Sequence, residues 1–327
     1  MRMRRRWLFA SLTLAVIAAA ACGSRTGLLV PLDLDGGDAS SDAFHRHDVF
    51  TLDAPDEDVL PPIDVTPPRD VLNDCPDAGS TLVYVITNSG TLMSFYPPSA
   101  TFRSIGTISC PTSGPTDQPF SMAVDRTGVA YIVFQNPGST SLGGELFRVS
   151  TLTAACAPTG FVRGQSGFSN TFGMGFSHDT VGTGETLYVA SDALGSQTPR
   201  LASIDTNTFK LTIIGDMANN MAELTGTGAG DLFAFYGIGS NTATDSAIGQ
   251  LDKTTGSTIA ESVLTGVTQG TGWAFAFWGG DFYTFTAPNG AGSIVTRFRP
   301  ADGSIVQVAS TSEVIVGAGV STCAPQQ

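Results

Sequence analysis

One hairpin phrase occurs five times in this chain, and that repetition is the strongest constraint on its fold. The copies read "LMSFYPPSATF", "LFRVSTLTAAC", "LASIDTNTFKL", "IGQLDKTTGST" and "VTRFRPADGSI". Aligned on their first apolar position, they place Leu92, Leu146, Leu201, Ile248 and Val295 in register, each followed three residues later by Phe95, Val149, Ile204, Leu251 or Phe298. Turn-forming residues come next in every copy. Each phrase therefore predicts a strand, a turn and a second strand.

The segments between the hairpins supply two further strands per repeat. They read "FSMAVDRTGVAYIVF", "FGMGFSHDTVGTGETLYVAS", "AELTGTGAGDLFAFY" and "WAFAFWGGDFYTFT", in which short alternating runs are separated by turn residues. Repeats of about 50 residues with four strands each are typical of β-propeller blades. Residues 80–327 have room for five such blades.

The two ends of this region complement each other. The first repeat begins at its second strand, "TLVYVIT", whereas the final segment "EVIVGAGVSTC" has no hairpin after it. The sequence thus predicts an all-β, five-bladed propeller of four-stranded blades, closed by the C-terminal strand, which completes the first blade. The hairpin phrasing resembles that of the YVTN, NHL and quinoprotein-like propeller families. That resemblance covers residues 80–327 and implies an architecture but no activity.

The first strand of each predicted blade, which lies nearest the axis, alternates large and small residues. Large ones such as Met122 and Phe275 are expected to pack between blades. Small ones such as Gly173 and Gly317 suit the crowding near a five-fold axis. Glu223 is the single charged residue in these aligned inner strands.

The N-terminus has the layout of a secretory signal. "MRMRRRWLFASLTLAVIAAAAC" places four arginines before an apolar run and then small residues. Its end resembles the bacterial lipobox, with Ala19 in place of the usual leucine. This resemblance implies that residues 1–21 are removed and that Cys22 receives the lipid anchor; an ordinary signal with a chance cysteine is the alternative. The predicted location is the bacterial cell envelope, with Gly23 favouring the outer membrane.

Residues 22–79 are predicted to be a disordered tether between the anchor and the propeller. Residues 28–79 contain 13 acidic residues and several prolines against only Arg46 and Arg69. Without residues 1–21 the chain has 12 basic and 29 acidic residues, a net charge of −17. Nucleic acid is therefore not an expected partner. Cation binding by the acidic run, or metal binding by His45 and His47, is the alternative to a solvated spacer.

Four cysteines remain beyond Cys22, and an oxidising envelope favours their pairing. Four cysteines allow three pairings. Cys110 and Cys156 end the outermost strands of adjacent blades, while Cys75 precedes the first blade and Cys323 ends the closing strand. This placement favours the pairs Cys75 with Cys323 and Cys110 with Cys156.

The sequence offers little for catalysis. His178, the one histidine of the domain, is expected in an exposed turn, and no G-x-S-x-G elbow accompanies it. Trp273 and Trp278 are expected to fill the core, with sugar stacking as the alternative. Oxygen-bearing residues are expected to converge on one mouth of the axis, where they could hold a ligand or Ca²⁺: Asp117, Asn170, Asn219, Asn220, Glu223 and Glu313. Ordinary turn chemistry is the other interpretation of these residues.

An anchor, a spacer and a recognition fold together predict a binding or scaffold module for an envelope protein or polysaccharide. A metal-dependent hydrolase or lactonase, like the gluconolactonase-type propellers that hold a divalent metal on the axis, is the alternative. We expect a monomer attached to the membrane by its lipid.

Overall fold

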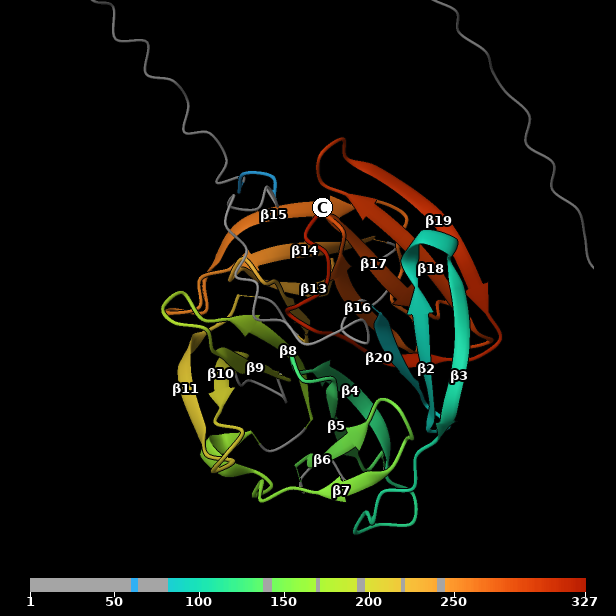
Figure 1. Ribbon diagram of the computed structural model, residues 1–327. Helices are drawn as coiled ribbons and strands as arrows, with labels where there is room; N and C mark the ends of the chain where they lie inside the picture. Colours follow the sequence, from blue (N-terminus) through green and yellow to red (C-terminus); the bar gives the residue numbers. More distant parts are fainter. Residues whose placement is uncertain are drawn as a thin grey trace, which may run out of the picture. The chain divides into compact units, whose positions relative to one another are not determined.

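The computed structural model describes residues 60–63, 82–137, 143–168, 171–192, 198–218, 221–239 and 245–327. Twenty strands in these ranges form five four-stranded sheets around a common axis (Figure 1). The predicted all-β, five-bladed propeller is therefore confirmed. Cys22, the predicted signal peptide and most of the predicted tether lie outside the described residues. Among the described residues, no helix is long and apolar enough to cross a membrane.

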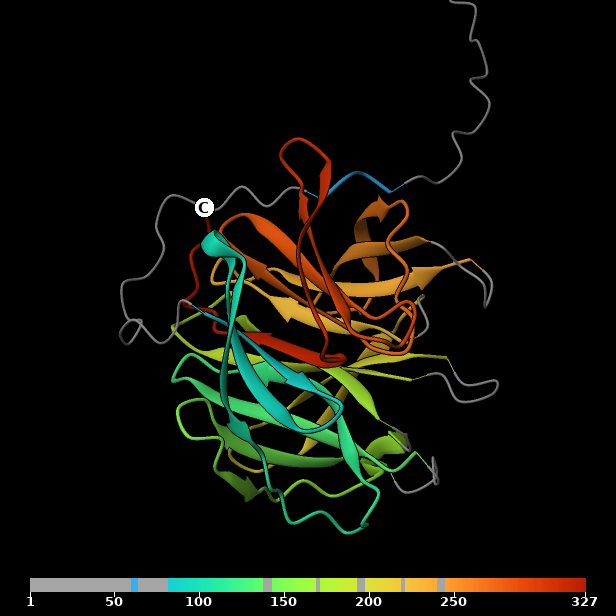
Figure 2. The ribbon, with the colours of Figure 1, turned by 90° about the vertical axis from the view of Figure 1, so that its right-hand side faces the viewer.

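Each blade runs from an inner strand at the axis to an outer strand at the rim (Figures 1 and 2). Blade 1 contains β20 (Ile315–Val320), β1 (Val83–Thr87), β2 (Thr91–Tyr96) and β3 (Thr101–Thr107); blade 2 contains β4 (Gln118–Val124), β5 (Val129–Gln135), β6 (Glu145–Ser150) and β7 (Cys156–Pro158). Blade 3 contains β8 (Phe172–His178), β9 (Glu185–Ser191), β10 (Arg200–Ile204) and β11 (Leu211–Asp216); blade 4 contains β12 (Glu223–Gly226), β13 (Leu232–Ile238), β14 (Asp245–Leu251) and β15 (Thr258–Leu264). Blade 5 contains β16 (Trp273–Trp278), β17 (Asp281–Thr286), β18 (Ser293–Arg299) and β19 (Ser304–Thr311).

The C-terminal strand β20 closes the ring. It pairs antiparallel with β1, with Val83 opposite Val320 and Ile86 opposite Gly317. Blade 1 thus takes its innermost strand from the other end of the domain, as the sequence predicted. Pairing satisfies backbone groups that an incomplete ring would leave exposed at a strand edge.

Five hydrophobic clusters fill the spaces between neighbouring blades, and the hairpin phrase explains them. Leu92 lies in the cluster between blades 1 and 2, whereas Phe95, three residues along β2, lies in the cluster between blades 5 and 1. A spacing of three puts two residues on opposite faces of a strand, so each hairpin contributes to two interfaces. The other four pairs follow the same rule: Leu146 with Val149, Leu201 with Ile204, Ile248 with Leu251, and Val295 with Phe298.

Glycines let the inner strands approach one another closely. A Cβ atom at Gly173 on β8 would lie 1.9 Å from the carbonyl oxygen of Ala222, immediately before β12. A Cβ at Gly317 on β20 would lie 2.8 Å from the amide nitrogen of Met122 on β4. These positions require glycine because a backbone, not a flexible side chain, occupies the space.

One predicted disulfide is present in the described residues. Cys110, which follows β3, is bonded to Cys156 on β7, with Cα atoms 5.2 Å apart, and so links the rims of blades 1 and 2. Cys323 is also disulfide-bonded. Because Cys75 lies outside the described residues, the pairing of Cys75 with Cys323 stays a prediction.

A short piece of the predicted tether lies against blade 4. The Pro61 carbonyl accepts a hydrogen bond from Glu261 N at 2.8 Å, and Ile63 N donates one to Ser262 Oγ at 3.3 Å. The Ile63 side chain is buried in the cluster between blades 4 and 5. Residues 60–63 thus lie beside the outer strand β15, a contact that the tether prediction did not contain.

Candidate functional site

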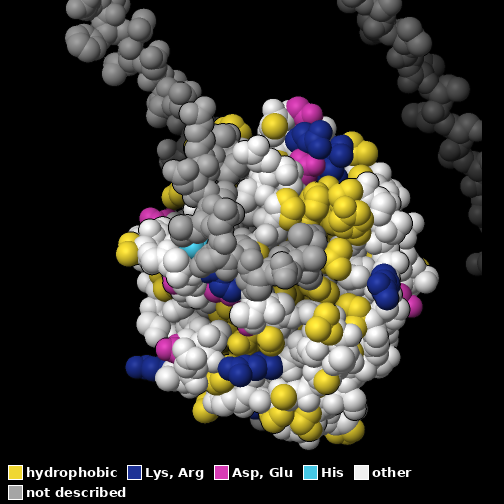
Figure 3. Space-filling view, viewed as in Figure 1, with side chains coloured by type: hydrophobic (Ala, Val, Ile, Leu, Met, Phe, Trp, Pro, Cys, Tyr) yellow, Lys and Arg dark blue, Asp and Glu magenta, His cyan; other side chains and the backbone are white. Residues whose placement is uncertain are grey.

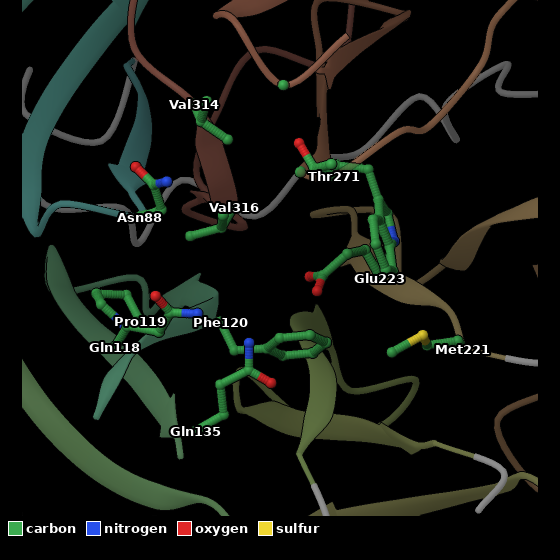
Figure 4. A pocket seen from close by; sticks show the side chains of 13 residues that line it. Asn88, Gln118, Pro119, Phe120, Gln135, Met221, Glu223, Thr271, Val314 and Val316 are labelled. Carbon is green, nitrogen blue, oxygen red and sulfur yellow. The ribbon is translucent and has the colours of Figure 1, made fainter. Parts of the chain in front are cut away.

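A cavity of about 300 Å³ lies at one end of the axis, where the inner strands begin. Its lining comes from the starts of β4, β12, β16 and β20, from the end of β5 and from the turns after β1 and β17. Polar and aromatic side chains dominate it: Asn88, Gln118, Phe120, Gln135, Glu223 and Trp273. Figure 4 shows the Asn88, Gln118 and Gln135 carboxamides on one side of the cavity and the Glu223 carboxyl group on the other.

Glu223 is the first residue of β12 and is 2% exposed. Its Oε2 accepts a hydrogen bond from Ser121 Oγ on β4 at 2.6 Å, and Ser121 Oγ in turn accepts one from Met174 N on β8 at 3.1 Å. Burial raises the pKa of the Glu223 carboxyl group well above its usual value, while the Ser121 hydrogen bond acts in the opposite direction. One carboxyl group thus joins three inner strands at the base of the cavity.

Two aromatic rings form part of the wall. Register shifts in β4 between Pro119 and Ser121, which leaves Phe120 as the extra residue of a β-bulge. Its ring contacts Trp273 edge to face, with centroids 6.3 Å apart and planes at 85°. Trp273 lines the cavity and also packs against the cluster between blades 4 and 5. Core packing, predicted for both tryptophans, therefore describes Trp273 only in part, whereas Trp278 packs between blades 5 and 1.

The predicted mouth residues are only partly brought together. Glu223 lines the cavity, but Asp117 and Glu313 do not. Asp117 Oδ2 instead accepts a hydrogen bond from Gly114 N at 2.9 Å within the loop before β4, and Glu313 lies in the turn between β19 and β20. Asn170, Asn219 and Asn220 lie outside the described residues. Within the part of the chain that is described, no three His, Cys, Asp or Glu side chains group as metal ligands would.

The opposite end of the axis is covered by the residues after β20. Thr322 Oγ1 donates a hydrogen bond to Glu185 Oε2 at 2.7 Å, and the Pro325 carbonyl accepts one from Gly279 N at 2.7 Å. Ala324 between them is buried. Figure 3 shows this face, where hydrophobic side chains also gather near the turn after β2, whose Tyr96 ring contacts Trp278 edge-on. Among the described residues, the C-terminal segment therefore covers the end of the axis opposite the cavity.

His178 lies at this closed end, and its interpretation as an exposed turn residue is wrong. It is the last residue of β8 and is only 9% exposed. Its Nδ1 lies 2.6 Å from the Asp179 carbonyl oxygen, which orients the ring. Lys253 Nζ donates a hydrogen bond to the His178 carbonyl at 2.7 Å. Strand pairing extends one residue further than the turn signal indicated.

Fold and cavity define the class: a five-bladed β-propeller whose described residues enclose a cavity at one end of the axis. No protein-family model matches the chain, and no curated protein matches its sequence. Solved structures resemble its fold. A chain of a nidogen–laminin complex has a TM-score of 0.43 and 12% identity, covering 73% of this chain and 97% of that one. TolB from Acinetobacter baumannii gives 0.40 and 11%, covering 75% and 69%. A calcium-binding regucalcin from Agrobacterium tumefaciens gives 0.38 and 14%, covering 68% and 66%.

Proposed function

We propose that this chain is an envelope binding module that holds a polysaccharide end or side group in its axial cavity. In this proposal Cys22 bears the lipid and the acidic segment spaces the propeller from the membrane, most consistently the outer membrane. The Cys110–Cys156 disulfide supports an oxidising, extracytoplasmic compartment. The observation that carries the proposal is the cavity itself, where aromatic, amide and carboxyl groups meet on an axis otherwise built from small residues.

The composition of the cavity favours a sugar over a protein surface. Aromatic rings present apolar faces that a pyranose can stack on, and carboxamides can both donate to and accept from its hydroxyl groups. Phe120 and Trp273 supply the first kind of contact, and Gln118 and Gln135 the second. A volume of about 300 Å³ is at the small end of ligand sites and suits one sugar unit.

A metal-dependent hydrolase or lactonase is the competing function. Calcium takes six to eight oxygen ligands, usually including several carboxylates. Among the described lining residues, Glu223 supplies the one carboxyl group. We therefore place binding ahead of catalysis.

The test is a binding screen of the mature chain against envelope polysaccharides and a glycan array, followed by fluorescence titration. Trp273→Ala is expected to weaken binding at least about tenfold, because stacking on the cavity wall is lost. Trp278→Ala is the matched control, since it removes the other tryptophan of β16 at the strand's far end. Equal losses from both variants, or no glycan ligand at all, would refute the cavity as a sugar site. Metal-dependent turnover of lactones or esters, abolished by Glu223→Gln, would instead favour the hydrolase.

A further inference from the structure

The charge of the cavity lining restricts the chemical class of the ligand further. Of the described residues that line it, Glu223 is the one titratable side chain, so no lysine, arginine or histidine there balances the carboxylate. The hydrogen bond to Ser121 comes from a neutral hydroxyl. Glu223 is thus the one acidic side chain of the described cavity lining, and that lining has no cationic side chain.

We infer that the ligand presents a protonated amino group to Glu223, and that the sugar unit in the cavity is an amino sugar with a free amine. This inference rests on the proposed polysaccharide-binding function. Burial alone favours the neutral form of the Glu223 carboxyl group, whereas an ammonium group beside it favours the carboxylate and pairs with it. An N-acetylated sugar would place a neutral amide there, which has no charge to pair with a carboxylate.

The neighbouring side chains favour an organic ammonium group over a metal ion. Phe120 and Trp273 form the wall beside Glu223, and an aromatic face attracts an ammonium ion within about 6 Å of the ring centre. Met221 adds a polarisable thioether to the same wall. Hard cations such as Ca²⁺ prefer a shell of oxygen ligands, which aromatic rings do not provide.

The carboxamides of Gln118 and Gln135 complete the recognition of such a sugar. They lie across the cavity from Glu223 (Figure 4). A ring whose amine reaches Glu223 would extend its hydroxyl groups towards them, where each amide can donate and accept hydrogen bonds. The cavity thereby distinguishes the two sides of the sugar, one charged and one neutral.

The test compares three probes by calorimetry on the mature chain: a β-linked glucosamine tetramer, its N-acetylated counterpart and a glucose tetramer. The titrations are made at about pH 5.5, below the pKa of the glucosamine amines, so that most of these amines are protonated. We expect the glucosamine tetramer to bind at least about tenfold tighter than either neutral probe. Glu223→Gln should abolish that preference, because a glutamine side chain cannot carry the negative charge that pairs with the amine. Asp117→Asn, which changes a carboxylate outside the cavity lining, should keep the preference.

The outcomes separate the two proposals. Equal affinity for the three tetramers would overturn the amino-sugar inference and leave the polysaccharide proposal standing. A preference that persists in Glu223→Gln would also overturn it. Binding of none of them, together with an empty glycan array, would overturn both. Should Glu223→Gln fail to fold, competition experiments on the unaltered protein with cyclohexylammonium and with cyclohexanol replace it. We expect only the cation to displace the glucosamine tetramer. Equal displacement by both compounds would refute the inference.

Discussion

Gly173→Ala tests the close contact between inner strands on which the ring depends. The new methyl group would lie 1.9 Å from the Ala222 carbonyl oxygen, short by about 1.5 Å of the 3.4 Å at which ordinary contact begins. Ala222 is buried and precedes the inner strand β12, so β8 and β12 must move apart. Overpacking typically costs about 1–3 kcal/mol, and a backbone obstacle places this case at the upper end. We expect the free energy of unfolding to fall by about 3 kcal/mol.

Urea unfolding with the disulfides intact, followed by tryptophan fluorescence, measures this loss. Gly160→Ala is the matched control, because its methyl group would meet only the Phe209 ring edge at 3.4 Å, an ordinary contact. The control should differ from the unaltered protein by no more than about 0.5 kcal/mol. Gly317→Ala, with its nearest backbone atom at 2.8 Å, should fall between the two. Equal urea midpoints for the Gly173 and Gly160 variants would refute the argument that backbone contact at the axis requires glycine.

Four further results are expected. Replacing Cys110 and Cys156 by alanine releases a bond between residues 46 positions apart; chain entropy gives an upper estimate of about 4 kcal/mol for the stability lost in urea. Deleting residues 312–327 removes β20 and should cause aggregation on size-exclusion chromatography, because β1 loses its inner partner. The pKa of Glu223 is raised in the folded protein, so its proton stabilises the fold fully below the ordinary value near 4.5, and this stability is lost as the pH rises through the raised pKa. The free energy of unfolding, measured against that of Glu223→Gln, should therefore decline over that pH range. A difference that does not change with pH would contradict the effect of burial. Cys22→Ser should release the chain from membranes in fractionation, and a mutant that remains membrane-bound without lipid would contradict the anchor.

The sequence predicted the fold well because the decisive information is local and repeated. Leu92 and Phe95 alternate between two interfaces, and any chain that repeats this pair must place one hydrophobic face against the next copy. Ring closure was predictable from the missing first strand of blade 1 and the surplus strand at the C-terminus. The docking of Ile63 was not, because a single apolar residue between prolines and aspartates has no periodicity to indicate a partner.

The candidate site was predicted less completely. Glu223 stood out as the charged residue of an inner strand, and it does line the cavity. Phe120 was missed because its bulge interrupts the alternation on which strand patterns depend, so the sequence did not indicate where its ring points. Asp117 was expected at the mouth from its loop, yet its carboxylate is engaged by the Gly114 amide within that loop. Loop geometry decides such cases, and short-range composition does not specify it.

Glu223 departs from the pattern of the repeat, and it lies in the candidate site. At positions equivalent to Glu223, the other inner strands have Ser121, Gly173, Ala274 and Gly317, each small enough for close packing at the axis. A glutamate there has a desolvation cost that the small residues at the equivalent positions avoid. A ligand that pairs with this carboxyl group in the cavity would account for that cost, since real folds depart from local consistency mainly at functional sites. Ser121 positions this carboxyl group. Its hydroxyl donates a hydrogen bond to Glu223 and accepts one from the Met174 amide, so it fixes Glu223 relative to blades 2 and 3.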